Sequence, residues 1–167
     1  RGNYLITEKV EVKKNRVDLK SPQGILAEMD NYYGYAEDYN FITAPSKSTW
    51  VLKDAKSDLP DKDEAPLPAD TLAGWNDMKN TLSTLDSLLN SSNPDWNTIA
   101  SMIDVPSFVK YYFVYEMAEN PEIVASSIFF YKDGPGTKLY AGPIWDFDSS
   151  VGTYDHTESL GAFTNAE

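Results

Sequence analysis

Two carboxylates separated by one aromatic residue, in Asp146-Phe147-Asp148, are the side chains of this sequence best placed to do chemistry. They follow an apolar run that is typical of a strand, so both can project into the same space at the strand's end. Hard cations and the phosphates they carry need oxygen ligands grouped in this way. The spacing predicts a divalent-metal site at Asp146 and Asp148, and two surface aspartates that cap a turn are the alternative.

Composition limits what such a site could serve. The chain has 167 residues, of which 41% are hydrophobic, enough to bury the core of one domain. Its net charge of −12 argues against a nucleic acid or an anionic membrane as partner, because both contacts begin with clustered Lys and Arg. An acidic protein that handles phosphate must therefore bring a cation with it.

Several other chemistries are excluded by the residues that are missing. The absence of cysteine removes zinc-thiolate centres, disulfides and thiol nucleophiles. The one histidine, His156, lies in a polar stretch, which argues against a Ser-His-Asp triad. No apolar run approaches the roughly 20 residues of a membrane span, and no signal peptide is evident. The chain opens within an expected strand, which predicts a fragment of a larger domain.

The first part, residues 1–53, is predicted to be β-rich. Apolar and alternating runs predict strands at 4–12, 17–19, 25–29, 41–43 and 50–53. The tyrosines between Tyr32 and Tyr39 are either a sugar-stacking platform or ordinary half-buried packing. Residues 54–70 hold six acidic residues and three prolines, so they are expected to be an exposed connector, with a weak calcium loop as the alternative.

Residues 71–152 are predicted to form a helical lobe that ends in a β-hairpin. Asp70, Asp95 and Asp104 are expected to cap three successive helices. The first helix has one apolar face, made of Leu72, Trp75, Met78, Leu82, Leu85 and Leu89. The third, 105–118, is apolar all round, which predicts a buried central helix.

A Gly/Pro/Asp turn at 133–136 separates the hairpin strands expected at 127–132 and 137–142. Residues 153–167 are expected to be a polar tail. The predicted class is therefore α+β. Buried helix, polar loop, hairpin and strand-terminal Asp follow one another here in the order found in the large lobe of the protein kinase fold.

Five segments make the resemblance specific. In order and over nearly the whole chain, they resemble successive motifs of the CotH family of spore-coat-type atypical kinases. The segments are Gly2-Asn3-Tyr4-Leu5-Ile6-Thr7-Glu8-Lys9-Val10, Asp104-Val105-Pro106-Ser107-Phe108-Val109-Lys110-Tyr111-Tyr112, Tyr115-Glu116-Met117-Ala118-Glu119-Asn120, Ser127-Ile128-Phe129-Phe130-Tyr131-Lys132-Asp133 and Gly142-Pro143-Ile144-Trp145-Asp146-Phe147-Asp148.

The resemblance implies a diverged kinase fold and an ATP- and magnesium-dependent enzyme that phosphorylates serine on secreted or surface proteins of bacteria. It implies that Asp146 binds the metal and that Asp148 can share it. It also implies that the backbone of Glu8, Lys9 and Val10, in the connector between lobes, meets the adenine.

Two positions depart from the family's pattern. The catalytic carboxylate falls on Glu122, where the family usually has Asp, and Ser127 falls where a kinase usually has a metal-binding Asn. Glutamate is longer by one methylene, and a misplacement of 1 Å can reduce catalysis roughly 100-fold. Because no glycine-rich phosphate loop and no strand Lys paired with Glu precede Tyr4, we expect weak nucleotide affinity and negligible turnover of this fragment.

A rival interpretation is a non-catalytic adhesion or carbohydrate-binding module. Its basis is the 11 Tyr and 4 Trp of the sequence, together with the acidic charge and Glu122. Aromatic faces stack on sugars, and Asp146 with Asp148 could hold a structural calcium. This interpretation requires an exposed aromatic strip.

Overall fold

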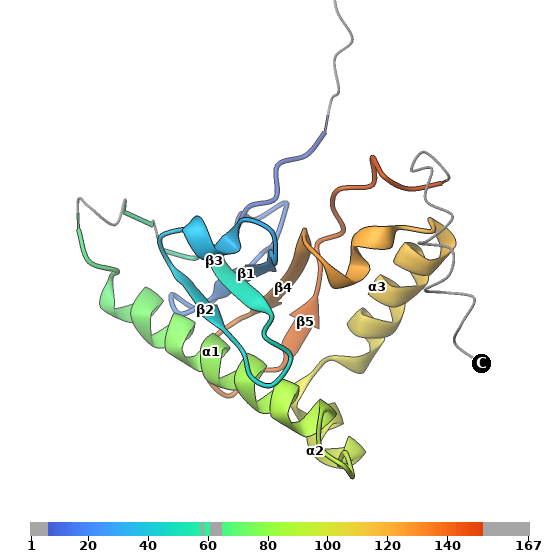
Figure 1. Ribbon diagram of the computed structural model, residues 1–167. Coiled ribbons are helices and arrows are strands. Elements are labelled where there is room, and N and C mark those ends of the chain that lie inside the picture. Colours follow the sequence, from blue (N-terminus) through green and yellow to red (C-terminus); the bar gives the residue numbers. More distant parts are fainter. Residues whose placement is uncertain (1–6, 58, 61–64, 152–167) are drawn as a thin grey trace, which may run out of the picture.

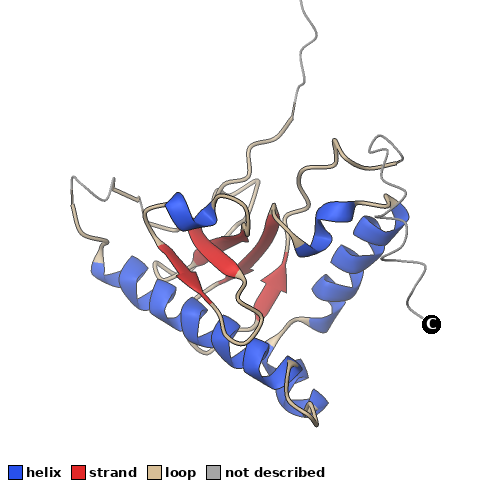
Figure 2. Cartoon of the chain, viewed as in Figure 1, coloured by secondary structure: helices blue, strands red, loops and turns tan. Residues whose placement is uncertain are grey.

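The computed structural model describes residues 7–57, 59–60 and 65–151. These residues form one antiparallel sheet flanked by helices (Figure 1; Figure 2), so the predicted α+β class is confirmed. The strands are β1 (Ile25–Met29), β2 (Asn40–Ile42), β3 (Thr49–Ala55), β4 (Ile128–Lys132) and β5 (Leu139–Ala141). The helices are α1 (Ala69–Leu89), α2 (Trp96–Met102) and α3 (Val105–Met117), with short 3-10 turns η1 (Gly34–Ala36) and η2 (Pro121–Val124).

The sheet pairs strands from the early and late parts of the sequence. Its strand order is β2-β3-β1-β4-β5, so β1 lies at the centre and pairs with both β3 and β4. All five residues of β1 are buried; four are apolar, and the fifth, Glu28, forms an ion pair with Lys53 at 2.6 Å. Strand β4 begins where Ile128 pairs with Met29, and this pairing fixes the position of the loop before it.

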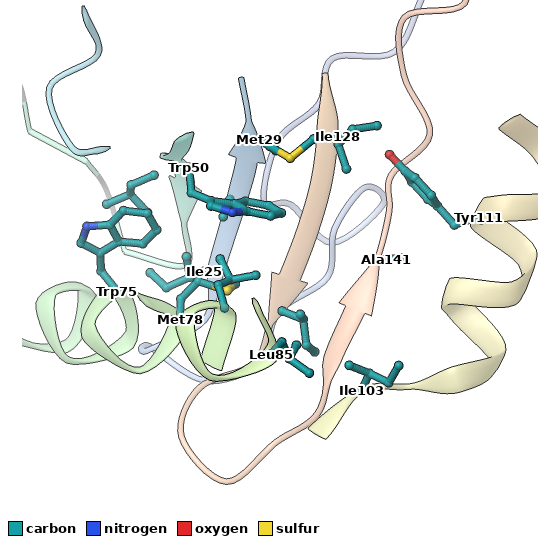
Figure 3. Packing of buried hydrophobic residues seen from close by; sticks show 14 of the residues in the cluster. Ile25, Met29, Trp50, Trp75, Met78, Leu85, Ile103, Tyr111, Ile128 and Ala141 are labelled. Carbon is teal, nitrogen blue, oxygen red and sulfur yellow. The ribbon is translucent and has the colours of Figure 1, made fainter. Parts of the chain in front are cut away.

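Helix α1 crosses one face of the sheet (Figure 1). Its Trp75, Met78, Leu82 and Leu85 join the main core with Ile25, Met29 and Trp50 (Figure 3). Gly74 permits the close approach, because a Cβ at this position would lie 2.1 Å from the carbonyl oxygen of Gln23. The apolar face is narrower than predicted, since Leu72 and Leu89 are exposed, and Pro68 precedes the helix where Asp70 was expected.

The opposite face is covered by residues 10–19, which form no strand. Val17 and Leu19 pack there against Leu26 and Phe129. The strands predicted at 4–12 and 17–19 are therefore wrong for the described residues; residues 4–6 lie outside them. Carboxylates take the place of a strand partner: Val12 N donates to Asp54 Oδ2 (2.7 Å), and Lys20 N donates to Asp133 Oδ1 (2.7 Å).

Helix α3 begins as predicted but is not buried all round. The Asp104 carboxylate accepts from Ser107 N at 3.0 Å, and Asp95 caps α2 in the same manner. Of the α3 side chains only Tyr111 and Tyr115 are buried, whereas Phe113 and Met117 are exposed. A helix at a sheet edge buries one stripe only. No helix in the described part of the chain is long and apolar enough to cross a membrane.

Candidate functional site

The loop after α3 is tied to the segment after β5 by Asn120. This side chain is fully buried. Its Oδ1 accepts from Glu122 N at 2.8 Å, which starts η2, and its Nδ2 donates to the carbonyl oxygen of Asp146 at 2.8 Å. A second backbone bond, from Val151 N to Ala118 O at 2.8 Å, closes the same two segments further along. One amide group therefore sets the position of both predicted catalytic elements.

Ser127 and Asp146 meet directly. The Ser127 hydroxyl donates to Asp146 Oδ2 at 3.0 Å. Both residues have left-handed backbone conformations, with φ of 56° and 63°. Such conformations are uncommon outside glycine and cluster at sites where surrounding contacts hold them.

Two buried tyrosines of α3 form hydrogen bonds with the backbone next to this contact. The Tyr111 hydroxyl donates to the Tyr115 hydroxyl at 3.0 Å. The Tyr115 hydroxyl lies 3.2 Å from the carbonyl oxygen of Trp145, which precedes Asp146, and 3.4 Å from that of Ser127. The Tyr115 ring also packs against Phe147, with ring centroids 4.8 Å apart. Helix α3 thus holds both strand-end segments through polar groups on its buried stripe.

Glu122 faces the acidic pair. Burial raises the pKa of Glu122, and the negative charges of Asp146 and Asp148 raise it further. Its Oε2 is buried without a hydrogen-bond partner among the described residues. Carboxylates separated by more than 20 residues in sequence are therefore brought into one electrostatic environment.

The like charges of these carboxylates repel one another, and a bound cation would relieve that repulsion. The described residues contain no preformed cluster of three His, Cys, Asp or Glu side chains that could hold a metal alone. Magnesium, however, is usually bound by one or two carboxylates together with phosphates and water. The unpartnered Glu122 oxygen and its raised pKa indicate a place where positive charge would be stabilising. The described carboxylates could hold such an ion only together with ligands from outside the chain.

The residues predicted to meet adenine line a neighbouring cavity. Glu8, Lys9 and Val10 line a space of about 310 Å³ together with Ile144 and Trp145. Trp145 directly precedes Asp146 in the chain, so one lining residue of this cavity is the sequence neighbour of the acidic pair.

Comparison with known families settles the relationship. The sequence model of the family described as CotH kinase protein matches residues 1–167. The chain belongs to the CotH family. No curated protein and no solved structure matches it closely enough to count as a relative.

In this CotH domain, sequence reasoning missed the supporting residues. Asn120 has a recognisable signal, because Asn before Pro is a favoured start of a helical turn. Tyr111 and Tyr115 are spaced four residues apart, so they share one helix face. The contacts of the Tyr115 hydroxyl with the carbonyl oxygens of Trp145 and Ser127 depend on the fold and have no sequence signal.

Proposed function

We propose that this chain is the central and C-terminal part of a CotH-like atypical protein kinase. It would use ATP and magnesium to phosphorylate serine on secreted or surface proteins. The observation that carries the proposal is the pair of hydrogen bonds made by the Asn120 side chain. One is with Glu122 N and the other with the carbonyl oxygen of Asp146, so the Glu122 loop is held against Asp146. The motifs of the CotH family assign the catalytic carboxylate and the metal ligand to these same two positions.

In the proposed reaction the acceptor serine hydroxyl attacks the γ-phosphorus of ATP. The new oxygen–phosphorus bond forms while the bond to the β,γ-bridging oxygen breaks, ADP leaves, and Glu122 accepts the hydroxyl proton. A pKa raised by burial and by like charges makes Glu122 a better proton acceptor than an ordinary surface glutamate. Its extra methylene relative to Asp is the feature expected to limit the rate.

Asp146 and Asp148 would hold magnesium, and the hydroxyl of Ser127 would orient Asp146 or join the ligand set. When bound, the ion neutralises charge on the phosphates. The backbone of Glu8, Lys9 and Val10 would meet the adenine in the cavity bounded by Trp145. The family suggests a bacterial cell surface or extracellular location, where the acceptor proteins would also lie.

The decisive experiment measures phosphate transfer from labelled ATP by the full-length protein. Asp146→Ala should reduce transfer to background, because it removes the main metal ligand. Asp38→Ala is the matched control, since Asp38 is exposed and remote in sequence from the site residues, and it should leave transfer unchanged. Full activity of Asp146→Ala would refute the assignment.

A second candidate, a carbohydrate-binding module, keeps one specific observation in its favour. Tyr32, Tyr33 and Tyr35 are 56%, 73% and 70% exposed and adjoin the short turn η1. Trp50 and Trp75, by contrast, are core residues, and the other exposed aromatic residues, Trp96, Tyr112 and Phe113, lie on α2 and α3 and not beside η1. Affinity electrophoresis on surface polysaccharides tests this candidate: Tyr33→Ala should abolish retardation if sugars stack there, and Tyr112→Ala should not.

A further inference from the structure

A separate cavity shares no lining residue with the candidate site. It has a volume of about 310 Å³ and is enclosed by the C-terminal half of α1, by α2 and by the turn between β2 and β3. Trp50, Leu85 and Ile103 supply three of its walls, from β3, α1 and the link to α3 (Figure 3). Pockets that hold small molecules begin at about this size and are mainly apolar.

One end of the cavity carries a carboxylate. Asp86 lines it, with Oδ2 accepting from Ser46 N at 3.1 Å and Oδ1 accepting from Asn90 Nδ2 at 2.9 Å. Both donors are neutral. In the part of the chain that the structure describes, every ion pair joins other residues, so no Lys or Arg side chain pairs with Asp86 in the lining of this apolar space.

The polar atoms beside Asp86 are already engaged with one another. The Ser46 hydroxyl lies 3.0 Å from that of Ser48 and 3.2 Å from that of Thr43. Each oxygen of the Asp86 carboxylate has a single donor, so each retains acceptor capacity. The site therefore lacks a charged donor and offers no charged group to an anion.

From this charge and shape we infer that the cavity binds a small organic cation: an aromatic or branched aliphatic body with one protonated amine. The body would replace water against Trp50, Leu85 and Ile99, and the ammonium would bond to Asp86. Trp96, which is 59% exposed at the rim, would cover the bound body. The inference does not depend on kinase activity.

The test titrates the 167-residue chain with 2-phenylethylamine and follows amide resonances by NMR. Shifts are expected at Ser46, Ser48 and Leu89. The neutral isostere 2-phenylethanol should bind at least about tenfold more weakly, as expected for loss of a charge-assisted hydrogen bond. The anion 3-phenylpropanoate should not bind.

Three variants complete the experiment. Asp86→Asn keeps an acceptor but removes the charge, so its affinity for the amine should fall about tenfold, to that of the alcohol. Asp70→Asn, on the same helix but outside the cavity, is the matched control and should bind as the parent does. Trp96→Ala, a change at an exposed position, should also weaken binding. Equal affinity for the amine and the alcohol, or unchanged binding by Asp86→Asn, would overturn the inference.

Discussion

At the scale of single residues, Asn120 has the largest structural role in the candidate site. Its buried amide satisfies one donor and one acceptor on two different segments. Asn120→Ala leaves both without partners, so we expect the free energy of unfolding to fall by about 2–4 kcal/mol. Urea denaturation measures this loss. Asn97→Ala, on the exposed surface of α2, should change it by less than about 0.5 kcal/mol; an equal effect of both would contradict the role given to Asn120.

Glu122 gives the site a pH dependence of known sign. Its pKa is raised in the folded chain, so the folded state binds the proton more tightly than the unfolded state. The resulting stability is present below the unfolded pKa of about 4.3 and is lost as pH rises through the folded pKa.

The variant Glu122→Gln should therefore unfold at the same temperature as the parent near pH 4 and at a higher temperature at pH 7. Scanning calorimetry at both pH values checks this. Glu119→Gln is the control, because Glu119 is exposed and should show no such difference. Burial also raises the pKa of Glu28, so part of the parent's pH dependence remains in the variant.

At the scale of elements, the docking of α1 depends on one glycine. A Cβ at position 74 would meet the backbone oxygen of Gln23, which cannot move as a side-chain end could. Gly74→Ala should reduce the free energy of unfolding by about 3 kcal/mol, the upper end for overpacking, despite the better helix propensity of Ala. Thermal unfolding measures it. Asn76 lies two residues further along α1 and is exposed, so Asn76→Ala should leave the free energy of unfolding unchanged or raise it slightly.

Elements with local signals were predictable. Strands β1 and β3, the hairpin of β4 and β5, and the Asp95 and Asp104 caps follow from apolar runs, turn residues and capping chemistry. The strand prediction for residues 10–19 is wrong because their apolar side chains cover a sheet face while their backbone bonds elsewhere: Val12 N donates to Asp54, and Val17 N and Leu19 N donate to nearby backbone oxygens. A period of two reports burial on one side and does not require a strand partner.

The sequence indicates candidate site residues, but it does not indicate the hydrogen bonds that hold them in place. Asp146 is visible because two Asp residues follow an apolar run, whereas Glu122 is singled out only by the family resemblance and departs there from the usual Asp. The bonds that hold them join residues 26 apart for Asn120 and Asp146, and 30 apart for Tyr115 and Trp145. Such contacts arise from the sheet, since the antiparallel pairing of β4 with β5 places the residues before β4, including Ser127, beside the segment that leads to Asp146.

At the scale of the whole molecule, negative charge dominates around the site. The segments 21–46, 111–131 and 139–151 contain four, three and two acidic residues respectively, and no Lys or Arg. In the adjacent cavity Lys9 lies 3.8 Å from Glu11, and Arg16 lies 3.1 Å from Glu8, so these cations are already paired. A nucleotide polyphosphate that approaches without a metal ion meets like charge.

ATP binding to this chain should therefore be weak and should require magnesium. In calorimetric titrations we expect replacement of magnesium by EDTA to lower the affinity at least about tenfold, because the carboxylates and phosphates then repel across the site. Asp146→Asn with Asp148→Asn should remove most of this difference, since neutral amides repel phosphate less and bind the ion poorly. Glu37→Gln with Asp38→Asn removes the same charge at exposed positions next to η1 and should preserve the magnesium dependence. Equally tight binding with and without magnesium would mean that the acidic pair takes no part in holding the nucleotide.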